Sequence, residues 1–349
     1  MEAVFFLFLS SGLFLGWSLG ASDASNIFGT AIGTKMVKFR TAAIIASVFV
    51  IIGAVYAGAG TTRTLNELGS VNTIAGAFMV ALAAGMSIYL MTNISLPVST
   101  SQAIVGAIIG WNIYSEKPTE MTVVSKIVST WVLCPILAGV IAILLYLALK
   151  SLMRRFPIHM IRQDMYLRVG LILAGAFGAY ALGANNIGNV MGVFVPSSPL
   201  QGFDILGISL NSAQVLFLIG GIAISVGIMT YSRKVIDTIG EGLMLMSPVM
   251  ALVVVVAQGV VLVLFSSKAL EAFLISHGLP ALPLVPVSST QAVIGAVMGI
   301  GLLKGGRGIR WSVFGKIAIG WVITPAIAAL ICFISLFFLE NVFRLPVFV

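Results

Sequence analysis

Apolar residues fill this chain in long runs, and polar residues gather in the short stretches between the runs. An apolar segment of about 20 residues is long enough to cross the hydrocarbon core of a bilayer as a helix. The pattern therefore predicts an all-α membrane protein with about 10–12 transmembrane helices. The ten clearest segments span residues 3–35, 42–60, 71–92, 97–113, 122–149, 168–196, 207–231, 243–266, 280–303 and 312–338.

Two of these segments carry small and polar residues in their middle. The first contains Gly-Ala-Ser-Asp-x-x-Asn (20–26), and the sixth contains Gly-Ala-Asn-Asn-x-x-Asn (183–189), 163 positions later. Close packing of small residues would explain the glycines and alanines but not the aspartate and asparagines. Polar groups inside a span are tolerated where they line a cavity or face other protein. We therefore expect broken or re-entrant helices at the membrane midplane in both segments.

Two further motifs recur in the same order. Pro-Val-Ser-Thr-Ser-Gln (97–102) returns as Pro-Val-Ser-Ser-Thr-Gln (286–291) at an offset of 189. Trp131 and Pro135 return as Trp321 and Pro325 at an offset of 190. Three ordered matches predict a duplicated fold, with a first repeat at 1–150, a basic cytoplasmic linker at 151–168 and a second repeat at 169–349.

The basic residues predict the orientation of the two repeats. Three clusters hold 12 of the 19 lysines and arginines, and four apolar segments separate each cluster from the next. The positive-inside rule places all three clusters in the cytoplasm and both termini outside. The two copies of each motif then run in opposite directions, which is the inverted-repeat architecture of many secondary transporters. The clusters are Lys35, Lys38 and Arg40; Lys150, Arg154, Arg155, Arg162 and Arg168; Lys304, Arg307, Arg310 and Lys316.

Composition narrows the class of protein. With 59% hydrophobic and 9% charged residues, the 349-residue chain has too little polar surface for a soluble globule. The net charge of +8 lies in short loops, so a nucleic-acid partner is not expected. A nucleotide-binding loop, a catalytic triad and zinc-ligand spacing are all missing from the sequence, so an enzyme and an ATP-driven pump are disfavoured and no cofactor is expected.

The Pro-Val-Ser motifs are typical of helix starts. Proline suits a first helical turn, and serine or threonine caps free backbone N–H groups. A helix N-terminus that faces a cavity offers partial positive charge and free donors to an oxyanion. Ordinary capping of two buried helices is the simpler alternative. The predicted anion-binding residues are Ser99, Thr100, Ser101, Gln102, Asn185, Ser288, Ser289, Thr290 and Gln291.

Asp23 suggests a site of the opposite sign. A carboxylate near the bilayer centre needs a cation or a proton. Asn26, Asn186 and Asn189 add oxygens, so we predict a coupling-cation site that binds Na+, with Asp23 as its metal ligand, or that takes up a proton instead. The attraction between this cation and an anion bound nearby would be a physical basis for symport.

These motifs together resemble the inorganic phosphate transporter (PiT) family over nearly the whole chain. The resemblance implies a cation-coupled phosphate permease with inverted repeats. Asn186 stands where the family usually has aspartate, and Gln102 and Gln291 stand where many members have histidine. Some relatives with altered motifs carry sulfate. The large hydrophilic central loop of eukaryotic members is absent, which indicates a prokaryotic member.

We therefore predict a symporter in a prokaryotic plasma membrane that imports inorganic phosphate with Na+ or H+. A sulfate permease of the same family is the alternative within transporters. A passive anion channel is the alternative from another class, and Asp23 argues against it because a channel needs no coupling carboxylate. The lipid bilayer is the expected surrounding, and a homo-oligomer is compatible with the sequence.

Overall fold

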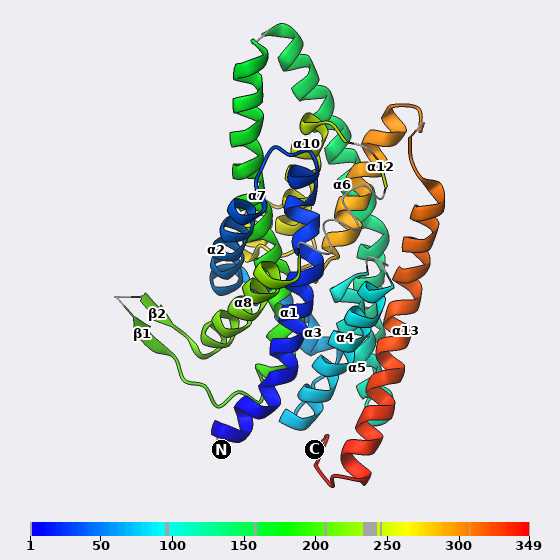
Figure 1. Ribbon diagram of the computed structural model, residues 1–349. Helices are drawn as coiled ribbons and strands as arrows, with labels where there is room; N and C mark the ends of the chain where they lie inside the picture. The colour runs from blue at the N-terminus through cyan, green and yellow to red at the C-terminus, as the bar shows by residue number, and fades with distance from the viewer. Residues whose placement is uncertain are drawn as a thin grey trace.

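The protein is described by a computed structural model for residues 2–94, 98–156, 159–205, 208–232, 243–244, 246–306 and 308–348. It is mostly helical, as predicted, and each of the ten predicted segments corresponds to a helix (Figure 1). Pro97 and Arg307 lie outside the described residues. The elements are α1 (Glu2–Gly33), α2 (Phe39–Ala57), α3 (Ala59–Leu68), α4 (Ile74–Asn93), α5 (Thr100–Tyr114), α6 (Met121–Arg155), α7 (Met160–Met191), η1 (Gly192–Phe194), β1 (Phe203–Ile205), β2 (Ile208–Leu210), α8 (Ser212–Thr230), α10 (Pro248–Leu264), α11 (Lys268–Ser276), α12 (Ser289–Leu303) and α13 (Trp311–Asn341).

Not every helix is long enough to cross a bilayer. Within the described residues, seven helices are long and apolar enough, or eight if α10 and α11, which are bent by 68°, count as one span. The other two predicted segments are α5 and α12, which have 15 residues each. At about 1.5 Å per residue, each covers roughly 22 Å of a hydrocarbon core about 30 Å thick. These two half-helices therefore start inside the protein.

The breaks predicted at the two Gly-Ala motifs are wrong. Both α1 and α7 run without interruption through their motifs, each over 32 residues. Neither motif contains a proline, and the Ser22 and Ser25 hydroxyls donate hydrogen bonds to the carbonyls of Leu19 and Ser22. The asparagines and Asp23 are buried against other protein rather than lipid, so a continuous helix can carry them.

Helices of matching length recur in the same order in the two repeats, although β1, β2 and α11 of the second repeat have no counterpart among the described elements of the first. Helices α1 and α7 have 32 residues each, α2 and α8 have 19 each, and α5 and α12 have 15 each. The repeats are intertwined, because α5 of the first packs along α13 of the second and α12 packs along α6. A Cβ atom at Gly106 would lie 2.1 Å from the Pro325 carbonyl oxygen, and one at Gly295 would lie 2.1 Å from that of Pro135. Only glycine allows these two close approaches.

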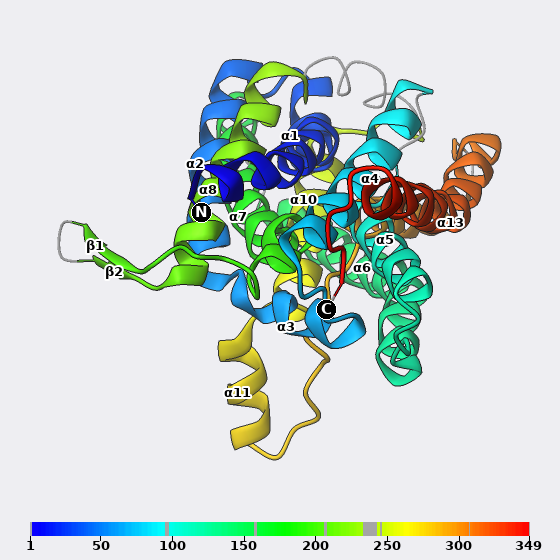
Figure 2. The same cartoon turned by 90° about the horizontal axis from the view of Figure 1, so that it is seen from below.

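The connections that carry the described members of the three basic clusters lie at one end of the bundle, and both termini lie at the other (Figure 1). The α1–α2, α6–α7 and α12–α13 connections share the upper end, as the spacing of the clusters predicts. The segment 151–168, predicted to be a linker, is largely helical, because α6 continues to Arg155 and α7 begins at Met160. Figure 2 looks at the bundle from the end that carries the termini, and α3 and α11, which line the same cavity, are both visible in it.

Candidate functional site

The two half-helices start beside one another in the interior. The Ser99 and Ser288 side chains cap them, accepting hydrogen bonds from the backbone N–H of Gln102 (3.3 Å) and Gln291 (3.1 Å). Each start also contacts the other. The Ser101 hydroxyl donates to the Val287 carbonyl (3.0 Å), and the Thr290 hydroxyl donates to the Val98 carbonyl (3.2 Å). Two helix N-termini, each with partial positive charge, therefore converge on one place.

The first Gly-Ala motif contacts the start of α12. The Ser289 hydroxyl donates a 2.7 Å hydrogen bond to one oxygen of Asp23, and the Ser22 hydroxyl donates a 3.1 Å bond to the other. The Asn26 amide donates to the Thr290 hydroxyl at 3.1 Å. The carboxylate is thus held at the N-terminus of α12, where the helix dipole favours a negative charge.

The second Gly-Ala motif contacts the start of α5 in an equivalent way. The Asn189 amide donates to the Ser101 hydroxyl (2.9 Å), which repeats the pairing of Asn26 with Thr290. Asn186 takes the place of Asp23, and its side-chain oxygen accepts a 2.9 Å bond from Asn189. The Thr100 hydroxyl, the equivalent of Ser289, has no partner among the described residues. The repeat symmetry is therefore broken where the charge lies.

Asn185 plays a different part from the one predicted by its motif alone. Its amide nitrogen donates to the Val287 carbonyl at 2.7 Å, and its amide oxygen accepts from the Val287 backbone N–H at 3.2 Å. Both groups are therefore used to hold the chain that leads into α12. In this conformation Asn185 holds the segment that leads into α12, and neither its amide nitrogen nor its amide oxygen is free to bind a ligand.

Several buried polar atoms of the site have no hydrogen-bond partner in the described part of the chain. They are Thr100 Oγ1, Gln102 Oε1, Asn189 Oδ1 and Gln291 Oε1. Buried polar atoms are normally paired, so unpaired ones that gather near two helix starts indicate a place for a ligand. The threonine hydroxyl can donate to an oxyanion, and the amide oxygens can accept a cation. All the predicted site residues are buried: Asp23, Asn26, Ser99, Thr100, Ser101, Gln102, Asn185, Asn186, Asn189, Ser288, Ser289, Thr290 and Gln291.

Three polar residues were not predicted as site residues, and two of them, Thr61 and Ser22, bond predicted ones. Thr61 on α3 donates a 3.1 Å hydrogen bond to the Asn185 carbonyl, and Ser22 bonds Asp23. Gln258 is fully buried in α10, and neither atom of its amide has a partner among the described residues. A lone amide in an apolar run was the available signal for Gln258. Thr61 gave none, because its role depends on where α3 docks.

Comparison with known proteins places the chain in a transporter family. The model of the phosphate transporter family matches residues 19–332. A protein of Methanocaldococcus jannaschii, provisionally named a phosphate permease, is 29% identical over 92% of this chain and 93% of its own length. A protein of Haemophilus influenzae with the same provisional name is 24% identical over 95% of this chain and 96% of its own. A solved structure described as the sodium-dependent phosphate transporter shares the fold with a TM-score of 0.74 at 20% identity, covering 95% of this chain and 99% of that one.

Proposed function

Because the chain belongs to the phosphate transporter family, we propose that it is a symporter that imports inorganic phosphate together with Na+ or H+. The family and the relatives named above are transporters, so the chain is a transport protein and not an enzyme. Its apolar helices make it a multi-pass membrane protein. The archaeal and bacterial relatives favour the plasma membrane of a prokaryote.

The hydrogen bond from Ser289 to Asp23 carries this proposal. It brings the buried carboxylate to the start of α12, beside the start of α5. The helix starts and free hydroxyls suit phosphate, whereas the carboxylate suits a cation or a proton. Each bound ion lowers the electrostatic cost of binding the other, so the loaded site favours cation and anion together. A channel would gain nothing from such a carboxylate in its path.

Uptake by the purified protein in proteoliposomes tests the proposal. Radiolabelled phosphate should accumulate above its equilibrium level only when an inward Na+ or H+ gradient is imposed, and the effective gradient identifies the coupling ion. Unlabelled phosphate should compete more strongly than sulfate. Uptake that stops at equilibrium under every gradient would favour a passive channel, and stronger competition by sulfate would favour a sulfate permease.

Asn186→Asp is expected to raise the cation requirement of transport. Asn186 is the repeat counterpart of Asp23, so the substitution places a second carboxylate beside the anion. Each carboxylate needs its own cation or proton when the anion is bound. Phosphate uptake should therefore depend more steeply on Na+ or H+ concentration than in the wild type. An unchanged slope with a shifted preference between phosphate and sulfate would show instead that Asn186 sets the substrate.

The orientation proposed for the chain has both termini outside. Phe343, 68% exposed, lies at the end of the bundle that carries the termini, and the exposed His159 lies at the other end. A membrane-impermeant maleimide added to intact cells should label Phe343→Cys and not His159→Cys. The buried Cys134 and Cys332 make the wild type a suitable unlabelled control. The reverse labelling pattern would place the basic clusters outside.

A further inference from the structure

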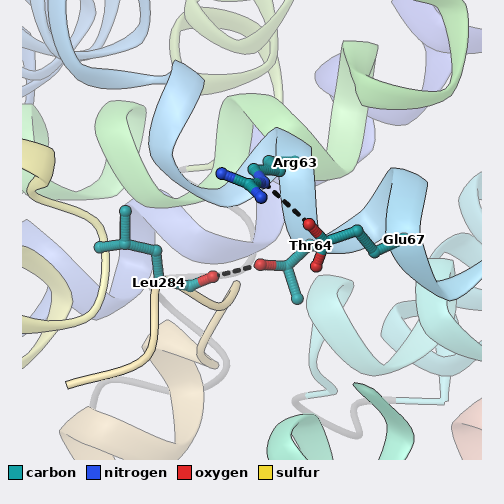
Figure 3. A network of polar contacts seen from close by, with 4 residues as sticks. All are labelled: Arg63, Thr64, Glu67 and Leu284. Atoms are coloured by element: carbon teal, nitrogen blue, oxygen red, sulfur yellow. Dashed lines mark hydrogen bonds and ion pairs between the residues drawn. The ribbon is translucent and has the colours of Figure 1, made fainter. Parts of the chain in front are cut away.

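A polar cavity lies at the end of the bundle that carries the termini. It is formed by α3, the start of α6 and the chain around α11, and it holds about 450 Å3. Figure 3 shows part of its wall, where Arg63 and Glu67 lie beside Thr64 and Leu284. The charged side chains that line it are Arg63, Glu67, Lys126, Lys268 and Glu271.

The charges of this cavity do not cancel. Arg63 and Glu67 form an ion pair at 2.8 Å, one helical turn apart on α3. Lys126 and Lys268 have no ion-pair partner in the part of the chain that the structure describes, and neither does Glu271. Three cationic and two anionic groups therefore leave one net positive charge, and both unpaired cations are exposed lysines.

The inner wall of the cavity borders the candidate functional site. Val285 lines the cavity and is buried, and only two residues separate it from Ser288, the cap of α12. The Thr64 hydroxyl donates a hydrogen bond to the neighbouring Leu284 carbonyl, which ties α3 to this segment (Figure 3). On its inner side α3 holds the Asn185 carbonyl through Thr61, at 3.1 Å. A single short helix thus lies between the cavity and the buried motifs.

We propose that this cavity is an access subsite for the oxyanion, in which Lys126 and Lys268 concentrate phosphate outside α3 before it reaches the buried site. The inference rests on the proposed function, because it assumes that phosphate is the substrate. A cleft with a net positive charge raises the local concentration of an anion and its association rate. The effect of exposed lysines is screened by salt, so it is largest at low ionic strength. The lysines affect the binding of phosphate from solution. They do not affect the later conformational change of the loaded transporter.

The double variant Lys126→Gln/Lys268→Gln tests this role. In proteoliposomes at low ionic strength its KM for phosphate should rise about tenfold, the low end of the range for electrostatic steering, with the maximal uptake rate unchanged. Raising the ionic strength with choline chloride at constant Na+ and pH should raise the wild-type KM towards that of the variant. Arg344→Gln is the matched control, because Arg344 is an exposed cation at the same end and does not line the cavity.

The charge at position 268 can be reversed after the protein has folded. Purified Lys268→Cys is labelled before reconstitution with either a sulfonate or a trimethylammonium methanethiosulfonate reagent of similar size. The anionic label should raise the KM further, and the cationic label should restore it. Wild-type protein, whose two cysteines are buried, controls for labelling elsewhere. Equal effects of both labels, or an unchanged KM in the double variant, would overturn the access subsite while leaving phosphate transport by the wild type intact. Lack of phosphate uptake by the wild type would instead overturn the proposed function.

Discussion

Asp23→Asn should abolish gradient-driven phosphate uptake while the protein still folds. The substitution removes the charge that neutralises a coupling cation, and an amide oxygen is a far weaker partner for that cation. We expect concentrative uptake to fall by about a hundredfold or more, which corresponds to about 2.7 kcal/mol. The fold should tolerate the change, because Asn186 is a buried asparagine at the equivalent position of the other repeat. Initial uptake rates and thermal stability in detergent measure the two expectations.

Asp164→Asn is the matched control for this variant. It also replaces an aspartate by asparagine, but Asp164 is half exposed and pairs with Arg168 at the surface, 3.2 Å away. Exposed ion pairs contribute little to stability, so the control should transport and melt like the wild type. Concentrative uptake by Asp23→Asn at the wild-type level would mean that another group couples the ion.

Removal of single hydroxyls from the helix starts should weaken phosphate binding in both repeats. Thr100→Val removes a free donor, and a hydrogen bond to a charged group is worth roughly 1.5–3 kcal/mol, or about tenfold or more in affinity. Ser289→Ala removes the hydroxyl that holds Asp23 at the start of α12, so it should disturb the site through the carboxylate. Thr100→Val should leave stability unchanged or improved, because its hydroxyl has no partner among the described residues. Isothermal titration with phosphate and thermal melting measure these effects.

The two hydroxyls should differ in their effect on the cation. Ser289 bonds Asp23 at 2.7 Å, so Ser289→Ala should also change the Na+ or H+ dependence, whereas Thr100→Val should not. Ser87→Ala is the control, since the Ser87 hydroxyl is buried but bonds a carbonyl of its own helix, at 2.8 Å. Wild-type phosphate affinity in Thr100→Val would mean that the start of α5 is only a capped helix and that the anion site is one-sided.

Much of the architecture could be predicted because the bilayer constrains it strongly. Each of the ten apolar segments contains a helix, and the motif offsets predicted two repeats. The half-helices could be expected at Ser99 and Ser288, where proline and capping residues coincide. The continuity of α1 and α7 could not, because polar residues favour a break only when the helix must otherwise expose them. Here Ser289 and Thr290 at the start of α12 form hydrogen bonds with Asp23 and Asn26, and α1 stays helical at both residues.

It was easier to predict which residues form the site than to predict which of them bond to one another. The residue types, their burial and their two-fold arrangement follow from repeated motifs. The contact of Asp23 with Ser289 joins residues 266 positions apart, and the use of Asn185 on the Val287 backbone depends on the intertwining of the repeats. The sequence alone does not indicate that residues so far apart in the chain are in contact. The cavity beside α3 has the same origin, since it joins Arg63, Lys126 and Lys268 from three separate elements.

The central claim is that a cation and phosphate occupy one site and stabilise each other there. Phosphate affinity of the purified wild type, measured by isothermal titration across Na+ concentrations and separately across pH, tests it most directly. Linkage requires that the coupling cation tighten phosphate binding and that phosphate tighten cation binding by the same factor. We predict this reciprocal increase for one of the two cations, and its loss in Asp23→Asn. Phosphate affinity that is independent of Na+, and that varies with pH only as phosphate itself titrates, would contradict the account.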